Sequence, residues 1–118
     1  MARVIAVFDD LLLGSNVLGM LQSAGHDATL AGAAAVDPAG VDLLIVDLGA
    51  GSFDGVGLVE HLRADGRLEG TRTLGVYSHV DAETRGRATD AGFDLVVPRS
   101  RMAREGQTLV EQLVVSNY

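Results

Sequence analysis

The stretch that most constrains the fold is a short apolar run that ends in a carboxylate and a glycine-rich loop. Residues 41–46 are branched apolar residues apart from Asp42, and Asp47 follows directly. Because the run is too short for a typical helix, we interpret it as a strand that is buried on both faces. Such strands belong to parallel sheets, which bind ligands at the carboxyl ends of their strands. The pattern therefore predicts Asp47 at a ligand-binding edge of an α/β sheet.

The rest of the chain alternates between strand and helix patterns. The predicted strands are residues 3–8, 26–31, 41–46, 73–77 and 94–97, and the predicted helices are residues 11–24, 56–64, 82–91 and a last one from Met102 or Glu105 to Val115. Residues 32–40 leave room for one short helix or helical turn. Repeated βα units predict a doubly wound (βα)5 fold with a parallel sheet, whose common five-stranded order is 2-1-3-4-5.

Length and composition restrict the class of protein. A chain of 118 residues is expected to form a single domain over residues 1–118 with one core. Apolar residues make up 47% and charged residues 21%, a balance typical of a globular domain rather than a disordered one. The absence of Cys excludes disulfides, thiol catalysis and cysteine-ligated metals, and fits a cytoplasmic location. No apolar run is long enough to predict a membrane span.

The charge of the chain argues against nucleic-acid binding by this domain. The formal net charge is −7, whereas a protein that contacts phosphate backbones is normally basic. All nine basic residues are Arg, and the chain contains no Lys. Any function that needs a cationic side chain must therefore use Arg.

Polar side chains stand at the predicted ends of four strands. Asp9 and Asp10 follow the first strand, Asp47 the third and Ser78 the fourth, while the fifth runs into Arg99. Clustered carboxylates repel one another, and a hard cation such as Mg²⁺, which prefers oxygen ligands, relieves that repulsion. A carboxylate in such a site can attack phosphorus to give an aspartyl phosphate. A hydroxyl and a guanidinium beside it could hold the phosphoryl oxygens.

With these residues in place, the chain resembles the receiver domains of two-component response regulators over nearly its whole length. The resemblance is carried by the acidic pair, Asp47, Ser78, the Asp54-Gly55 pair in the loop after Asp47, and the turn at residues 91–94. Arg99 stands seven residues past Gly92, where receivers usually have lysine. The resemblance implies a flavodoxin-like receiver fold, here with a short second helix.

The resemblance also implies a function for the site. It makes Asp47 the residue that a histidine kinase or phosphotransfer protein phosphorylates in a Mg²⁺-dependent reaction. Asp9, Asp10, Asp47 and the backbone carbonyl of Gly49 would be the metal ligands. Ser78 and Arg99 would act on the phosphoryl group. Such a domain catalyses only its own phosphorylation, is not otherwise an enzyme, and signals through contacts with an output protein or a second copy of itself.

Several positions depart from the receiver pattern and support a second interpretation. Arg99 replaces the lysine, and a planar guanidinium is not equivalent to an ammonium group. Ser100 and Val96 stand where a proline and an aromatic switch residue are common, Gly51 replaces a common proline, and His79 follows Ser78 where a small residue is usual. The alternative is a phosphorylation-independent pseudo-receiver that serves as an interaction or dimerisation module.

Simpler roles remain open for the same residues. Asp9 and Asp10 could be helix caps only, and it is open which of them would be the main metal ligand. Asp54 is expected in a turn rather than as a ligand. Ser78 begins a capping-box-like pattern, and Arg99 could be a surface cation.

The glycine-rich segment 49–55 invites a third interpretation, a small flavodoxin-like binder or enzyme. Its spacing is Gly-x-Gly-x-x-x-Gly, and it follows the third predicted strand rather than the first. A dinucleotide fingerprint has a different spacing and a ribose-binding acid after it. We therefore do not expect a nucleotide cofactor. The three histidines share no metal-ligand spacing.

Overall fold

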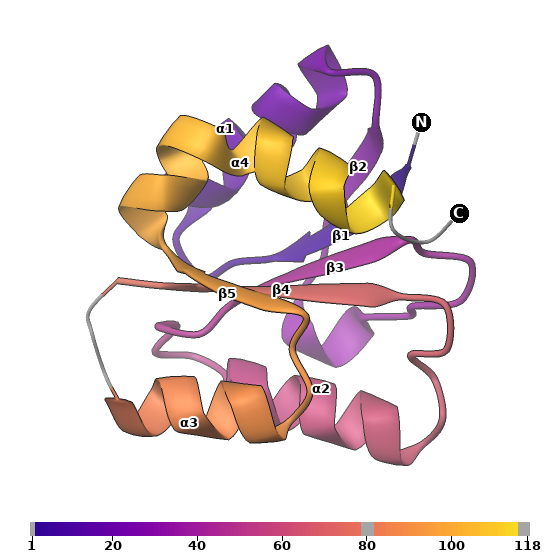
Figure 1. The fold of residues 1–118 in the computed structure, drawn as a ribbon, viewed down its shortest axis with the longest axis vertical. Helices are drawn as coiled ribbons and strands as arrows, with labels where there is room; N and C mark the ends of the chain where they lie inside the picture. The colour runs from indigo at the N-terminus through magenta and orange to yellow at the C-terminus, as the bar shows by residue number, and fades with distance from the viewer. Residues whose placement is uncertain (1, 79–81, 116–118) are drawn as a thin grey trace.

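The computed structural model of the chain describes residues 2–78 and 82–115. In chain order the elements are β1 (Arg3–Val7), α1 (Leu11–Ser23), β2 (Asp27–Leu30), the 3₁₀ turn η1 (Ala33–Ala35), β3 (Leu43–Asp47), α2 (Gly55–Ala64), β4 (Arg72–Tyr77), α3 (Ala82–Asp90), β5 (Leu95–Pro98) and α4 (Arg99–Val115) (Figure 1). The alternation of strands and helices is the predicted one. Among the described helices, none has the length and apolar character needed to cross a membrane.

The strands form one parallel five-stranded sheet in the order β2-β1-β3-β4-β5, which confirms the predicted topology. Strand β3 lies at the centre between β1 and β4. In this register Val46 is opposite Val7 on β1, and Asp47 is opposite Val76 on β4. The carboxyl ends of these three strands therefore meet at one edge, where Asp47 is the last residue of β3.

Helices cover both faces of the sheet. Helices α1 and α4 pack on one face, and α2 and α3 pack on the other (Figure 1). Successive residues of β3 contribute to different cores: Leu43 and Ile45 face α1 and α4, whereas Leu44 and Val46 face α2 and α3. All four side chains are fully buried. This two-sided burial explains why β3 is a continuous apolar run without alternation.

Helix α1 begins and ends at residues that sequence preferences favour at such positions. Asp10 is the N-cap of α1, and its Oδ1 accepts hydrogen bonds from the backbone N–H groups of Leu12 and Leu13. Gly25 ends that helix region with a φ of 91°, a conformation that favours glycine. Asp81, which precedes the predicted helix 82–91 and is the cap expected from the sequence, and His79 lie outside the described residues.

The start of the last helix differs from the sequence-based prediction, whereas the segment between β2 and β3 agrees with it. The last helix begins at Arg99, directly after β5, rather than at Met102 or Glu105. Met102 lies in the first turn of α4 and is fully buried in the core on this side of the sheet. The packing of Met102 therefore holds the polar residues before it in the helix. The segment between β2 and β3 contains only the three-residue turn η1, in line with the predicted short second helix.

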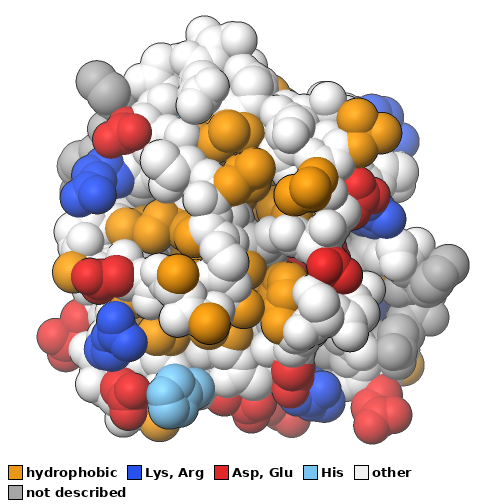
Figure 2. Space-filling model, turned by 180° about the vertical axis from the view of Figure 1, so that it is seen from behind, with side chains coloured by type: hydrophobic (Ala, Val, Ile, Leu, Met, Phe, Trp, Pro, Cys, Tyr) orange, Lys and Arg blue, Asp and Glu red, His pale blue; other side chains and the backbone are white. Residues whose placement is uncertain are grey.

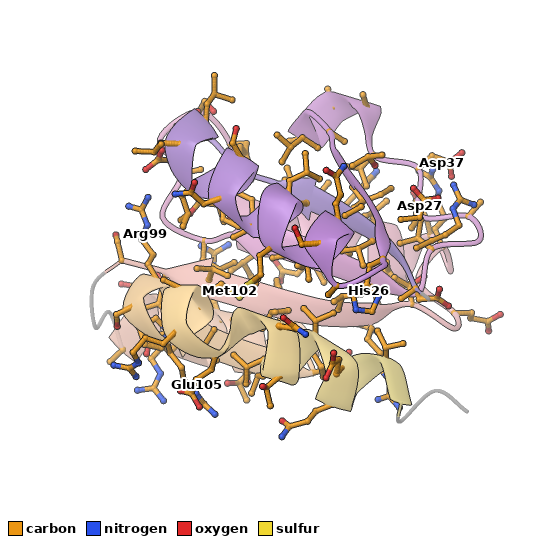
Figure 3. All side chains as sticks on the ribbon, turned by 90° about the horizontal axis from the view of Figure 1, so that it is seen from above. His26, Asp27, Asp37, Arg99, Met102 and Glu105 are labelled. Carbon is orange, nitrogen blue, oxygen red and sulfur yellow. The ribbon has the colours of Figure 1, made fainter. Side chains whose placement is uncertain are left out.

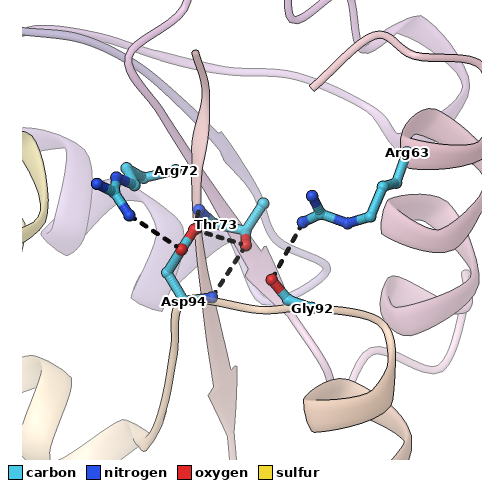
Figure 4. Close-up of polar contacts among 5 residues, drawn as sticks. All are labelled: Arg63, Arg72, Thr73, Gly92 and Asp94. Atoms are coloured by element: carbon cyan, nitrogen blue, oxygen red, sulfur yellow. Dashed lines mark hydrogen bonds and ion pairs between the residues drawn. The ribbon is translucent and has the colours of Figure 1, made fainter. Parts of the chain in front are cut away.

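A polar cluster connects β4 to β5 at the amino ends of these strands, opposite the end of the sheet that carries Asp47 (Figure 4). The carboxylate of Asp94 accepts hydrogen bonds from the backbone N–H of Thr73, at 2.8 Å, and from its hydroxyl. Arg72 pairs with the other oxygen of Asp94 at 3.3 Å. Arg63 of α2 donates to the backbone carbonyls of residues 91 and 92. These contacts fix the start of β5, so the chain is anchored before it reaches the Asp47 edge.

Candidate functional site

The candidate site is centred on Asp47. Its side chain is only 6% exposed, although it stands at the end of a strand. Its Oδ1 accepts a hydrogen bond of 2.9 Å from the backbone N–H of Gly49. Within the described residues, Oδ2 makes no hydrogen bond that would hold it. One carboxylate oxygen is thus fixed by the following turn.

Gly49 lies close to both Asp47 and Ser78. A methyl group built on Gly49 would lie 3.2 Å from Ser78 Oγ and 3.6 Å from Asp47 Oδ1. The hydroxyl and the carboxylate therefore both lie beside Gly49, and a larger residue at this position would be in contact with both. The ends of β3 and β4 thus come together as the strand order requires.

Asp9 points to the glycine-rich loop after β3. Its Oδ1 accepts a hydrogen bond of 2.7 Å from Ser52 Oγ, and its Oδ2 accepts one of 3.1 Å from the backbone N–H of Gly51. These bonds, with the Ser52 hydroxyl first, hold the pKa of Asp9 below its ordinary value. Asp9 therefore fastens the loop 49–54 to the end of β1.

Asp10 joins the starts of two helices. Its Oδ1 caps α1, while its Oδ2 accepts a close hydrogen bond from Nη2 of Arg99, the first residue of α4. The backbone N–H of Leu13, followed by Arg99, lowers the pKa of Asp10 below its ordinary value. Figure 3 shows Arg99 at the beginning of α4, which runs beside α1.

The oxygen atoms of the site suit Mg²⁺ chemically, but their arrangement does not form a ready site. Hard cations prefer carboxylate and carbonyl oxygens, which Asp9, Asp10, Asp47 and Gly49 can supply. Within the described residues, however, no three acidic, histidine or cysteine side chains converge as a metal site would require. Asp9 is directed to Ser52 and Asp10 to Arg99. As they stand, the carboxylates do not fit the ion.

The structure adds residues to the site that the sequence analysis did not single out. Ser52 was not predicted to contact Asp9, because the direction in which a glycine-rich loop folds depends on tertiary contacts. Gly55 allows α2 to start directly against β3: a methyl group built there would lie 2.7 Å from the carbonyl oxygen of Asp47. A glycine at the first position of a helix, after a capping residue, is the sequence signal for such a close approach.

The position of Asp54 agrees with the expected turn rather than with a ligand role. Asp54 is the N-cap of α2, with Oδ1 accepting a 3.1 Å hydrogen bond from the backbone N–H of Gly57. Its Oδ2 pairs with Arg87 of α3 at 3.0 Å. The carboxylate thus connects two helices on the α2–α3 face of the sheet.

Comparisons with known proteins find similar structures but no similar sequences. No protein-family model and no curated protein sequence matches the chain. Among solved structures, a CheY-like response regulator receiver domain protein from Methanospirillum hungatei JF-1 superimposes with a TM-score of 0.86 at 18% identity, covering 99% of this chain and 96% of that one. The receiver domain of the Francisella response regulator 1452 gives a TM-score of 0.86 at 17% identity and covers 100% of both chains.

A third similar structure is the signal receiver domain of a modulated diguanylate cyclase from Desulfovibrio desulfuricans G20. Its TM-score is 0.81 at 22% identity, covering 99% of this chain and 96% of that one. The chain therefore has the fold of response-regulator receiver domains, as the sequence resemblance predicts. The similarity extends over the full described sheet and its flanking helices, including the edge that carries Asp47.

Proposed function

We propose that the protein is a receiver-type signalling module that accepts a phosphoryl group on Asp47 and acts through contacts with other proteins. The observation that carries this proposal is the environment of Asp47. It is a buried carboxylate at the end of the central strand, one of its oxygens accepts a hydrogen bond from Gly49, and Gly49 also lies close to Ser78 Oγ. A similar fold in three receiver domains supports the proposal.

The proposed chemistry is a transfer of a phosphoryl group to a carboxylate. Asp47 Oδ2 attacks the phosphorus of a donor, a new O–P bond forms, and the bond between phosphorus and the leaving group breaks. The leaving group departs with the bonding electrons. Ser78 Oγ donates a hydrogen bond to a phosphoryl oxygen beside Gly49. Mg²⁺, a histidine kinase or phosphotransfer protein as donor, and an output protein as receiver of the signal are parts of this proposal.

Exposed apolar side chains near the site support the proposal that the domain binds other proteins. Leu11 and Leu12, which directly follow Asp10, are 73% and 74% exposed. Large apolar side chains on a surface favour partner binding. On the face seen from behind, apolar side chains occupy much of the centre and charged side chains lie around them (Figure 2). This surface is compatible with a partner or with a second copy of the chain.

Intact-mass spectrometry tests the proposal. The protein is incubated with Mg²⁺ and a small-molecule phosphodonor, beside the variants Asp47→Asn and Asp54→Asn. We expect a phosphoryl-sized increase in mass for the wild type and for Asp54→Asn, whose exposed carboxylate caps α2, and no increase for Asp47→Asn. An increase that persists in Asp47→Asn would contradict the proposed acceptor.

A phosphorylation-independent interaction module is the second candidate. The contacts of the acidic pair favour it: Asp9 is hydrogen-bonded to Ser52, and Asp10 is paired with Arg99. In this case the site stabilises the fold instead of switching it. Sedimentation with and without a phosphoryl analogue separates the two candidates, because the interaction module requires the same oligomeric state under both conditions. In the intact-mass experiment, the interaction module also requires that the wild type shows no increase.

A further inference from the structure

We infer that a cavity at the amino ends of β4 and β5 binds a small anion through the guanidinium of Arg63. The cavity has a volume of about 280 Å³ and is lined by Arg63, Gly70, Thr71, Arg72 and Asp94. It lies at the end of the sheet opposite Asp47, so it is separate from the proposed phosphoryl chemistry. The class of ligand is an ion or a small molecule whose negative charge is carried by oxygen atoms, as in phosphate and carboxylate groups.

Arg63 is the cationic group that attracts such a ligand. Its Nε donates a hydrogen bond of 2.9 Å to the carbonyl oxygen of Ala91, and its Nη2 donates one of 3.1 Å to the carbonyl oxygen of Gly92 (Figure 4). Both carbonyls follow α3, and the carboxyl end of a helix carries only a partial negative charge. These bonds therefore fix the guanidinium without cancelling its positive charge.

The acidic residue of the cavity is already committed to other donors. Asp94 Oδ2 accepts the backbone N–H of Thr73 at 2.8 Å and its hydroxyl at 3.2 Å, while Oδ1 pairs with Arg72 at 3.3 Å. Two guanidiniums and one carboxylate give the lining a net charge of +1. The whole chain, in contrast, carries −7. The cavity is thus a locally positive place on an acidic protein, where an anion gains favourable electrostatic energy.

The guanidinium is held in position before a ligand arrives. A methyl group built on Gly92 would lie 3.1 Å from Arg63 Nε and 3.3 Å from its Cζ, so the guanidinium rests against the backbone of this turn. The hydroxyl of Thr71 donates a buried hydrogen bond of 2.8 Å to the carbonyl of Val41 and holds another wall. A preorganised donor loses little conformational entropy on binding. The volume is near the lower end of ligand cavities, roughly 300 Å³, which favours a small ligand.

Titration with inorganic phosphate, followed by NMR at constant ionic strength, tests the inference. We expect the amide signals of residues 70–73 and 92–94 and the side-chain Nε–H signal of Arg63 to shift with saturation. A parallel titration with acetate distinguishes a phosphate ligand from a carboxylate ligand, and saturation by either anion supports the site. Shifts that do not saturate with either anion, or that occur only around Asp47, would overturn it.

A pair of arginine variants tests the assigned donor. Arg63→Gln removes the charge from the cavity, and we expect the dissociation constant of the anion to rise at least about tenfold, as for the loss of a hydrogen bond to a charged group. Arg67→Gln is the matched control, because it changes the net charge equally but Arg67 pairs with Asp37 at 3.5 Å. It should bind like the wild type. Equal weakening in both variants would be a general charge effect and would overturn the inference.

A second pair of variants leaves Arg63 in place, since this residue also anchors the turn before β5. Gly70 lines the cavity, has a φ of 77°, and has no atom within 4 Å of an added Cβ. Asn and Asp are the side chains that best tolerate this backbone conformation. Gly70→Asp adds a negative charge to the cavity and should weaken anion binding at least about tenfold relative to Gly70→Asn, which has the same shape. Equal affinities of these two variants would contradict an anion in this cavity.

Discussion

Arg87 of α3 donates a hydrogen bond of 3.0 Å from Nη2 to Oδ2 of Asp54, the residue that caps α2. The other carboxylate oxygen of Asp54 accepts the backbone N–H of Gly57. Helix α3 is otherwise weakly attached, because Ala88 is its one buried side chain within the described residues. Asp54 therefore performs two tasks, as a helix cap and as a tie between the helices that cover one face of the sheet.

A comparison of Asp54→Ala with Arg87→Gln should separate the contribution of the helix cap from that of the ion pair. Asp54→Ala removes the cap and the ion pair, and we expect a loss of about 1 to 2 kcal/mol in the free energy of unfolding. Arg87→Gln leaves the cap in place, removes this ion pair and the longer one with Glu60 at 3.8 Å, and should cost less than Asp54→Ala. Urea denaturation followed by circular dichroism measures both. An Arg87→Gln loss as large as that of Asp54→Ala would show that the tie, and not the cap, is the main contribution.

The contribution of Asp54 should also depend on pH. The hydrogen bond from Gly57, followed by that from Arg87, lowers the pKa of Asp54 below its ordinary value of 3.8. A carboxyl group with a lowered folded-state pKa stabilises the fold above the unfolded-state pKa, and this stabilisation is lost as the pH falls through the folded-state pKa. The stability difference between wild type and Asp54→Asn should thus be constant near neutral pH and shrink below about pH 4. A difference that grows on acidification would contradict this assignment.

The fold could be predicted from the sequence because its main signals are local. Residues 41–46 have no polar face, and such a run fits only a strand that helices cover on both sides. Turn residues separate the other strands from their helices. The start of α4 was missed, because Arg99, Ser100 and Arg101 are polar and suggest a loop. The burial of Met102 against the sheet, which is a tertiary effect, extends the helix back to β5.

The positions of the strand-end residues were predictable from the sequence, but their contacts were not. Strand ends can be read from the sequence, so Asp9, Asp10, Asp47 and Ser78 were expected at one edge. Which way each carboxylate turns depends on groups that come from distant parts of the chain. Arg99 is 89 positions from Asp10, and Ser52 is 43 positions from Asp9. No local pattern encodes such pairs.

Substitution of glycine by alanine should affect stability differently where the glycine contacts other groups and where it has free space around it. A methyl group at Gly55 would meet the backbone oxygen of Asp47 at 2.7 Å and Val46 Cγ1 at 2.8 Å, and the backbone atom cannot move without disturbing the sheet. We expect Gly55→Ala to lose about 2 kcal/mol or more in the free energy of unfolding. Gly19 lies within α1 with no atom within 4 Å of such a methyl group. Gly19→Ala should gain about 0.5 to 1 kcal/mol.

Thermal and urea denaturation of the two variants test this contrast. Since both substitutions add one methyl group to a helix, differences in helix propensity alone would predict a gain in both cases. A gain for Gly55→Ala would mean that the start of α2 can move away from β3. In that event, the close approach of Gly55 to Asp47 would not constrain the site.

Gly49 offers a test of whether the proposed phosphoryl group lies between Asp47 and Ser78. A methyl group at this position would lie 3.2 Å from Ser78 Oγ and 3.6 Å from Asp47 Oδ1, where the proposed phosphoryl group must fit. Gly49 does not have a positive φ, so alanine should not strain the backbone. We expect Gly49→Ala to keep the stability of the wild type within about 0.5 kcal/mol. Its phosphoryl incorporation, followed by intact mass over time, should fall at least about tenfold.

Gly51→Ala is the matched control in the same loop. Gly51 also lacks a positive φ, and the nearest atom to its added methyl group would be Asp9 Oδ2 at 3.9 Å, an ordinary contact. This variant should incorporate phosphoryl groups like the wild type, because the space between Asp47 and Ser78 is unchanged. Equal rates for Gly49→Ala and the wild type would show that the phosphoryl group does not enter that space. Equal losses in both variants would instead point to the mobility of the loop, since only one of the two methyl groups lies beside Asp47.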